Sequence, residues 1–265
     1  MESGAAPRTP TGLRIYAIGD IHGRADLLET VQGRIAGDLA HRPPADWRVV
    51  YLGDYVDRGP DSAGVIDRLA VTGPADRSYF LRGNHDHALA AFLADPDTPG
   101  LYRWLDDGGC KTLRSYGIEV YTPTEIPDAR ARRALRSALV AAMPAEHVGF
   151  LEGLPHLIRL GDYAFVHAGV RPGVALEAQT PRDLMEIREP FLASTADFGA
   201  VVVHGHSPAP RPERRANRIG IDTGAGQGGP LTCLVLEGAE VAVLGPKGPR
   251  ALPLPENVAA EERAA

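Results

Sequence analysis

The stretch Arg82-Gly83-Asn84-His85-Asp86 follows the apolar run Tyr79-Phe80-Leu81, where a strand is expected. Alone it would be an ordinary turn between a strand and a helix, with Asp86 helping to start the helix. It decides the fold because four further segments also carry histidine or aspartate at short β-like runs. These segments are Gly19-Asp20-Ile21-His22-Gly23, Gly53-Asp54-Tyr55-Val56-Asp57-Arg58-Gly59, Phe165-Val166-His167-Ala168-Gly169 and Val203-His204-Gly205-His206.

Strand, turn and helix alternate three times in the first part of the chain. Short β-branched and apolar runs predict strands at residues 13–18, 47–52 and 78–81. Apolar residues at helical spacing predict helices at residues 25–39 and 62–69. This alternation predicts parallel βαβ units in a layered α/β core. Ligands of such sheets bind at the carboxyl ends of the strands, which is where the first three motifs lie.

In the remaining two thirds of the chain, the spacing of apolar residues is first helical and then strand-like. Helical spacing dominates from His85 to about Gly153, so we expect residues 88–153 to form a helical cap beside the site. Strand-like runs with short connections then predict a second, mainly antiparallel sheet. We expect one domain over residues 13–245, with flexible tails at 1–12 and 246–265. The strand-like runs are residues 156–160, 163–166, 200–203, 218–221, 231–236 and 240–244.

Each turn has a simpler explanation when it is taken alone. Asp20 and His22 could form an Asx-turn with an incidental histidine, and Asp57 could make a local salt bridge to Arg58. Coincidence becomes a poor explanation when five such turns occur at strand ends. The candidate donors are nitrogen and oxygen atoms without sulfur, which favours Mn, Fe or Zn over a zinc–thiolate site.

Composition limits the setting and the partners. The chain has 265 residues, which suits one large α/β domain or at most two small ones. Because 34 acidic residues outnumber 28 basic ones, we expect no nucleic-acid partner. Cys110 and Cys233 have no metal-binding spacing, which predicts a reduced, cytoplasmic protein. No run approaches the roughly 18 apolar residues of a membrane span, so we expect no membrane partner, and the oligomeric state stays open.

The ordered set of motifs resembles the calcineurin-like metallophosphoesterase superfamily. Within it, the chain is similar to the phosphoprotein-phosphatase branch, especially the compact bacterial and phage serine/threonine phosphatases. The resemblance implies a four-layered α/β/β/α sandwich with a helical cap insertion. It is carried by GDIHG at 19–23, GDYVDRG at 53–59, RGNHD at 82–86, HAG at 167–169 and GHS at 205–207.

The resemblance also implies two metal ions that share one carboxylate. We expect manganese, although iron or zinc would accept the same ligands. His206 is preferred over His204 because the family ligand lies in a Gly-His-Ser/Thr position. The implied ligands are Asp20, His22 and Asp54 for the first ion, and Asp54, Asn84, His167 and His206 for the second.

The same resemblance implies roles for the catalytic side chains. A hydroxide activated by the two metals would attack phosphorus directly and in line. His85, held by Asp57, would protonate the leaving group, and Arg58 and Arg188 would bind phosphate oxygens. One departure is Glu186, which stands where the family often has tryptophan.

The resemblance leaves three functions open. The first is a serine/threonine phosphoprotein phosphatase, with a phosphoprotein or phosphopeptide as its partner. The second is a hydrolase of diadenosine tetraphosphate and other dinucleoside polyphosphates, which uses the same motifs. The third is a non-catalytic binding scaffold. Every ligand position is filled in this sequence, which argues against a scaffold.

Overall fold

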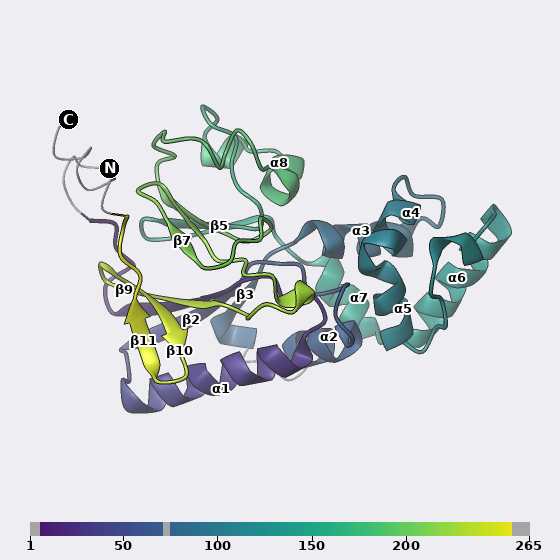
Figure 1. Cartoon of the computed structure of the whole chain (residues 1–265), viewed down its shortest axis with the longest axis horizontal. Coiled ribbons are helices and arrows are strands. Elements are labelled where there is room, and N and C mark those ends of the chain that lie inside the picture. Colours follow the sequence, from purple (N-terminus) through teal and green to yellow (C-terminus); the bar gives the residue numbers. More distant parts are fainter. Residues whose placement is uncertain (1–5, 71–74, 256–265) are drawn as a thin grey trace.

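The computed structural model describes residues 6–70 and 75–255 and contains two β-sheets with helices on their outer faces (Figure 1). The strands are β1 (Leu13–Ile18), β2 (Asp46–Tyr51), β3 (Ser78–Phe80), β4 (Leu157–Leu160), β5 (Tyr163–Val166), β6 (Val201–His204), β7 (Glu213–Arg214), β8 (Arg218–Gly220), β9 (Cys233–Glu237), β10 (Glu240–Gly245) and β11 (Gly248–Ala251). The α-helices are α1 (Ala25–His41), α2 (Ser62–Ala70), α3 (Asn84–Ala94), α4 (Leu101–Trp104), α5 (Cys110–Ser115), α6 (Ala129–Ala142), α7 (Ala145–Glu152) and α8 (Pro181–Glu186). Shorter helical segments are η1 (Ala75–Arg77), η2 (Leu105–Gly109), η3 (Pro123–Glu125), η4 (Leu176–Ala178) and η5 (Ala225–Gln227).

The first sheet has the strand order β11-β10-β9-β1-β2-β3. As predicted from the alternation of strand and helix, β1, β2 and β3 are parallel neighbours. The strands β9, β10 and β11 extend this sheet on the other side in antiparallel pairs. The carboxyl ends of β1, β2 and β3 therefore share one edge of the sheet, and the first three motifs follow these ends.

The second sheet differs from its prediction. Its order is β4-β5-β6-β8-β7, and β5, β6 and β8 are parallel. The predicted strands at 231–236 and 240–244 belong to the first sheet, as β9 and β10. The expectation of a mainly antiparallel second sheet was thus wrong, because the connections 167–200 and 205–217 are long enough to carry the chain back for parallel pairing.

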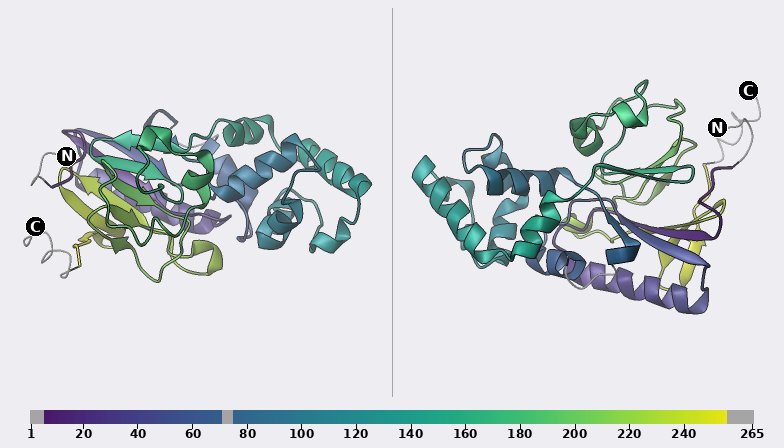
Figure 2. Two further views of the ribbon diagram at one scale, coloured as in Figure 1. Left: turned by 90° about the horizontal axis from the view of Figure 1, so that it is seen from above. Right: turned by 180° about the vertical axis from the view of Figure 1, so that it is seen from behind.

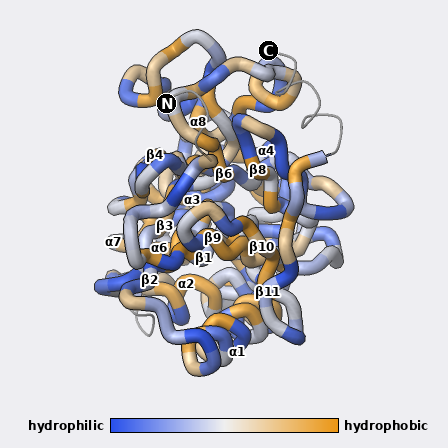
Figure 3. The backbone as a smooth tube through the Cα atoms, turned by 90° about the vertical axis from the view of Figure 1, so that its left-hand side faces the viewer, coloured by the Kyte–Doolittle hydropathy of each residue, from blue (hydrophilic) through white to orange (hydrophobic). Residues whose placement is uncertain are grey.

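Alternating side chains of the strands fill three separate apolar layers. In β1, Ile15 and Ala17 lie between the two sheets, while Tyr16 and Ile18 lie in the layer that includes α1. In β6, Val202 points to the outer face of the second sheet, in the layer that includes Leu184 of α8. In Figure 3 the hydrophobic segments gather along the strands, among them β6 and β9. Three apolar layers separate four structural layers, which confirms the predicted α/β/β/α sandwich.

The helices α3 to α7 stand together at one end of the sandwich, as all three views agree (Figures 1 and 2). They pack on one another and on α2 through the apolar layer of the first sheet. The predicted cap residues 88–153 fall within this helical part. The candidate site lies where this helical part meets the two sheets.

The two predicted tails carry structure in part. Thr9 N donates to Gly238 O at 3.0 Å, and Gly238 N donates to the Thr9 hydroxyl at 2.9 Å. The segment Gly248–Ala251 is strand β11, paired with β10. The expectation of flexible tails over all of 1–12 and 246–265 is corrected to this extent, because backbone pairing fixes these residues. Residues 1–5 and 256–265 lie outside the described residues.

Candidate metal centre

Five turns from the two sheets bring the candidate ligands to one place. Asp20 and His22 follow β1, Asp54 follows β2, and Asn84 begins α3 after β3. His167 directly follows β5, and His206 lies two residues after β6. Because these strands are parallel within each sheet, their carboxyl ends meet at one edge. The side chains of Asp20, His22, Asp54 and His167 are buried there.

The backbone of these turns is held in an unusual conformation. Within residues 6–70 and 75–255, every non-glycine residue with positive φ lies in one of the site turns. Such conformations are costly for residues with a Cβ and persist where surrounding contacts impose them, commonly at functional sites. The residues are His22 (φ 48°), Asp54 (52°), Asp57 (72°), Arg58 (63°) and His206 (61°).

The buried Asp86 carboxylate holds the Asp54 turn in place. Its Oδ2 accepts hydrogen bonds from the backbone N–H groups of Gly83 at 2.9 Å and Asp54 at 2.8 Å. Its Oδ1 accepts one from Tyr55 N at 2.9 Å. Asp86 was predicted only to help start a helix, because these contacts join residues that are distant along the chain. Gly83 must be glycine here, since a Cβ would collide with the Asp54 carboxylate.

One group of candidate metal ligands, called the first donor group here, consists of His22, Asp54 and His85. Single ligand atoms of these three residues lie within 4.8 Å of one another. His22 Nδ1 lies 2.9 Å from Val56 O, to which it can donate only as the Nδ1–H tautomer. That leaves a lone pair on Nε2, which lies 2.7 Å from Arg58 Nη1 and 3.5 Å from Asp54 Oδ2. Burial lowers the pKa of His22 to about 3, which keeps the ring neutral and able to bind a metal.

The second donor group consists of Asp54, His167 and His206, whose ligand atoms again lie within 4.8 Å of one another. His167 Nδ1 lies 2.8 Å from Leu52 O, so its Nε2 also points into the site. That Nε2 is 3.4 Å from Asp54 Oδ2 and 3.1 Å from Asn84 Oδ1. The amide oxygen of Asn84 therefore joins this group, and Asp54 is common to both groups.

Asp20 lies beside these groups without belonging to either. Its carboxylate accepts the backbone N–H of His206, at 3.2 Å and 3.1 Å for the two oxygens. Burial and the neighbouring Asp222 raise the pKa of Asp20 well above its usual range. Asp222 is itself buried, and it was not among the predicted site residues. A cation would relieve the charge that these carboxylates place together.

The charges around Asp54 also favour a bound cation. Burial opposes its ionisation, but His167, His85 and His22 together outweigh that effect and hold the pKa of Asp54 well below its usual range. Burial would lower the pKa of His167, whereas Asp54 and Asp20 raise it to about 10. The buried carboxylates thus draw a positive charge to this point. Oriented imidazole nitrogens, carboxylates and an amide oxygen fit metal binding of the predicted kind.

His85 and Asp57 form the hydrogen-bonded pair that was predicted for proton transfer. His85 Nδ1 lies 2.7 Å from Asp57 Oδ2. Two side chains of the helical part also donate to this carboxylate: Trp104 Nε1 to Oδ2 at 2.9 Å and Thr112 Oγ1 to Oδ1 at 2.6 Å. Trp104 and Thr112 were not among the predicted site residues.

The surroundings of His85 favour its charged form. Burial alone would lower the pKa of His85, but the carboxylates of Asp54 and Asp57 outweigh it and raise that pKa. His85 also belongs to the first donor group, so its Nε2 faces the position where a metal or substrate would lie. The geometry suits a proton donor that is oriented from behind by a carboxylate.

His204 takes no part in either donor group. Its Nδ1 lies 3.0 Å from Gly205 O, and its ring packs edge-on against Phe191, with ring centroids 5.0 Å apart. His206 instead lies against His167, with centroids 5.1 Å apart. The structure therefore brings His206 to the site and leaves His204 in the apolar layer of α8.

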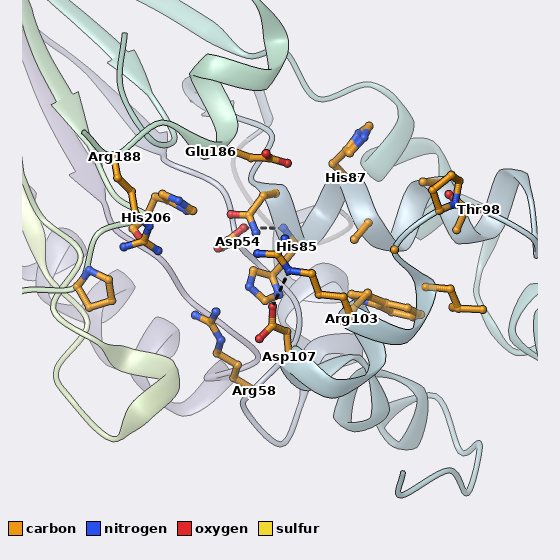
Figure 4. Close-up of a pocket in the computed structure, with 18 of the residues that line it drawn as sticks. Asp54, Arg58, His85, His87, Thr98, Arg103, Asp107, Glu186, Arg188 and His206 are labelled. Carbon is orange, nitrogen blue, oxygen red and sulfur yellow. Dashed lines mark hydrogen bonds and ion pairs between the residues drawn. The ribbon is translucent and has the colours of Figure 1, made fainter. Parts of the chain in front are cut away.

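The donor groups open into a cavity of about 640 Å³ between the sheets and the helical part (Figure 4). Arg58 and Arg188, predicted to bind phosphate, both line it. Arg58 Nη1 lies 2.7 Å from His22 Nε2, and Arg188 Nη2 donates to His206 O at 3.3 Å. Glu186 lines the same cavity, so the departure noted in the sequence falls at the site.

The fold and the donor set together define a metallophosphoesterase, a hydrolase that acts on phosphoester bonds. The chain belongs to the calcineurin-like phosphoesterase family, whose pattern matches residues 13–227. No helix among the described residues is long and apolar enough to cross a membrane.

Two relatives are similar to most of the chain. The asymmetrical bis(5′-nucleosyl)-tetraphosphatase PrpE of Bacillus velezensis is 25% identical over 235 residues, which cover 81% of this chain and 86% of that protein. The symmetrical bis(5′-nucleosyl)-tetraphosphatase of Dechloromonas aromatica is 27% identical over 280 residues, which cover 90% of this chain and 98% of that protein. These relatives contradict the prediction of a phosphoprotein or phosphopeptide partner, because both are named for small dinucleotide substrates.

Solved structures share the fold. A putative diadenosine tetraphosphatase superposes with a TM-score of 0.58 at 21% identity, and the match covers 95% of this chain and 100% of that one. A cold-active protein tyrosine phosphatase gives a TM-score of 0.55 at 15% identity, covering 93% and 82%. At these identities the likeness concerns the fold alone.

Proposed function

We propose that this chain hydrolyses dinucleoside polyphosphates such as diadenosine tetraphosphate. The observation that carries the proposal is the pair of bis(5′-nucleosyl)-tetraphosphatases that are 25% and 27% identical over most of this chain. The cavity supports it, because about 640 Å³ extends from the donor groups to the helical part and leaves room for more than one phosphoryl group.

We infer that the chain holds two metal ions around Asp54. His22 and Asp54 of the first donor group would hold one ion together with Asp20, which lies beside that group and is included because of the family resemblance. The second ion would be held by Asp54, Asn84, His167 and His206. When bound, such ions supply Lewis acidity at phosphoryl oxygens and an activated water. We expect manganese, and the same donors would accept iron or zinc.

The remaining site residues would bind the phosphate chain and move a proton. Arg58 and Arg188 line the cavity, and a guanidinium fork matches the geometry of phosphoryl oxygens. Asp57 would hold His85 with its proton on the side facing the leaving group. A leaving nucleotide departs through a phosphate oxygen, which needs this proton less than an alkoxide does.

A substrate panel tests the proposal. Purified protein is freed of metal with a chelator, supplied with Mn²⁺, and offered diadenosine tetraphosphate, a phosphoserine peptide and p-nitrophenyl phosphate. We expect the highest kcat/KM for the dinucleotide, and no turnover by Asp54→Asn. A kcat/KM for the phosphopeptide that exceeds the value for the dinucleotide would reject the proposal. Separation of the products, as two ADP or as ATP and AMP, distinguishes symmetrical from asymmetrical cleavage.

A further inference from the structure

Arg103 brings a third guanidinium to the cavity, from the helical part of the molecule. It lies on α4 and lines the cavity with Arg58 and Arg188, which come from the β2 turn and from the segment after α8. Figure 4 shows its side chain extending toward the centre of the pocket, in front of His85. The sequence singled out Arg58 and Arg188 but not Arg103.

The position of Arg103 is tied to the catalytic pair. The next residue, Trp104, is buried and donates its indole N–H to Asp57 at 2.9 Å. Asp57 in turn lies 2.7 Å from His85. Because Trp104 anchors α4 to this pair, Arg103 keeps a defined place relative to the reacting phosphoryl group. An arginine on a surface helix without such an anchor would have no fixed position relative to the site.

The guanidinium of Arg103 is available to a ligand. Its side chain is 89% exposed, and it pairs with Asp107 one helical turn later at 3.7 Å. An exposed pair at this distance contributes little and exchanges readily for a better partner. Asp107 and Glu186 also line the cavity and would repel phosphate. A bound polyphosphate therefore needs cationic partners along its length, and the pair of Arg58 and Arg188 serves its reacting end.

The cavity continues past the donor groups along α3 and the segment before α4. Residues of this outer part include Ala88, Ala91, Thr98 and Pro99. A phosphomonoester would place its one phosphoryl group at the donor groups and would not reach this part. A tetraphosphate chain would continue into it past Arg103, whose side chain lies on the cavity wall between His85 and this outer part.

We propose that Arg103 binds the phosphates beyond the reacting one and so makes the pocket prefer a polyphosphate chain to a single phosphoryl ester. This inference rests on the proposed function for its natural substrate. Its chemical content is narrower: a multiply charged phosphate chain is recognised by a cap arginine that a phosphomonoester does not touch.

The variant Arg103→Met tests this, with Arg133→Met as the matched control, since Arg133 is exposed on α6 and lies outside the cavity. Two constants are measured for Mn²⁺-loaded protein: the KM for diadenosine tetraphosphate, and the Ki of inorganic tripolyphosphate against p-nitrophenyl phosphate hydrolysis. We expect Arg103→Met to raise both by about 10-fold or more, the scale of a lost charge-assisted hydrogen bond. The KM for p-nitrophenyl phosphate should stay within about 2-fold, and Arg133→Met should change nothing.

The outcomes separate this inference from the proposed function. If KM and Ki stay unchanged in Arg103→Met, or if the KM for p-nitrophenyl phosphate rises equally, the inference is overturned. If the wild type does not cleave the dinucleotide, the proposed function fails, and the Ki of tripolyphosphate alone decides the role of Arg103. Circular dichroism of both variants excludes a folding defect as the cause.

Discussion

Asp57 receives hydrogen bonds from three side chains that lie far apart in the sequence. His85 is the second residue of α3, Trp104 ends α4 and Thr112 lies in α5. Their bonds to the carboxylate measure 2.7, 2.9 and 2.6 Å. The carboxylate is thereby fixed and can orient the imidazole of His85. At the scale of single residues, we propose that this pair transfers the proton while other side chains hold the metals.

The variant His85→Asn should keep the metals and lose rate. For an alkyl phosphate, whose leaving group needs a proton, we expect kcat to fall by about 10²–10⁴-fold. For diadenosine tetraphosphate the loss should be smaller, because its leaving group is already acidic. Steady-state kinetics on both substrates, with metal content measured by mass spectrometry, checks this. Loss of a metal from the variant would instead make His85 a ligand, as its place in the first donor group permits.

A second prediction concerns Asp86. In Asp86→Asn one oxygen becomes an NH₂ group, so at least one of the three buried backbone donors loses its acceptor. We expect a loss of about 1–3 kcal/mol in the free energy of unfolding. Metal affinity should fall about 10–100-fold, because the turn that carries Asp54 is no longer held. Urea unfolding and metal titration measure the two effects.

The control for Asp86 is Asp106→Asn, which changes an exposed carboxylate of the same helical part. Its stability and metal affinity should match those of the wild type. Equal metal affinity in Asp86→Asn and the wild type would show that Asp86 does not position the ligand.

At the scale of elements, a buried ionic cluster joins α1 to the first sheet. The Asp38 carboxylate on α1 accepts hydrogen bonds from Arg42 at 2.8 and 2.9 Å, from Tyr16 at 2.6 Å and from Arg14 at 3.2 Å. Arg14 and Tyr16 lie on β1, and Arg14 also donates to Glu237 of β9 at 2.9 Å. The helix is therefore fixed against the strand that leads to Asp20 and His22.

This cluster predicts a dependence of stability on pH. Burial would raise the pKa of Asp38, but hydrogen bonds from Arg42 and Tyr16 outweigh it and lower that pKa. A lowered folded-state pKa means that the stabilisation is present above the unfolded pKa of about 3.9 and is lost as pH falls through the folded value. At pH 7 we expect Asp38→Asn to lose about 1–3 kcal/mol of unfolding free energy.

Urea unfolding at pH 7 and at pH 3.5 measures the effect. The difference between wild type and Asp38→Asn should shrink at the lower pH. Glu29→Gln is the matched control, because Glu29 is on the same helix but its side chain is 70% exposed. It should stay within about 0.5 kcal/mol of the wild type at both pH values. A constant difference between the Asp38 variant and the wild type would show that ionisation of Asp38 does not contribute.

At the scale of the whole molecule, local patterns predicted the elements better than their partners. The strand β1 was predicted at its observed bounds, because its β-branched run is closed by turn residues on both sides. The sheet that β9 and β10 join could not be predicted in the same way, since β9 pairs with β1, which lies more than 200 residues earlier, and β10 follows β9 into that sheet. Pairing over such distances depends on the packed layers and leaves no local pattern.

In the site, too, residues with a local sequence pattern were predicted, and residues that act through distant contacts were not. The predicted ligands occur in turns with recognisable residues, and the structure brings Asp54, His167 and His206 together. The residues that position them were not predicted: Asp86 acts on the turn after β2, and Trp104 reaches Asp57 from another helix. These contacts exist only after folding. The metal ligands and the phosphate-binding roles of Arg58 and Arg188 remain predictions.

The most direct test of the proposed two-metal site follows hydrolysis of diadenosine tetraphosphate while Mn²⁺ is added to metal-free protein. We expect no turnover without metal and a rise that saturates at two ions per chain, with no rise in Asp54→Asn, which lacks the proposed shared carboxylate. Turnover that persists in excess chelator, or full activity of Asp54→Asn at the same metal content, would contradict this site.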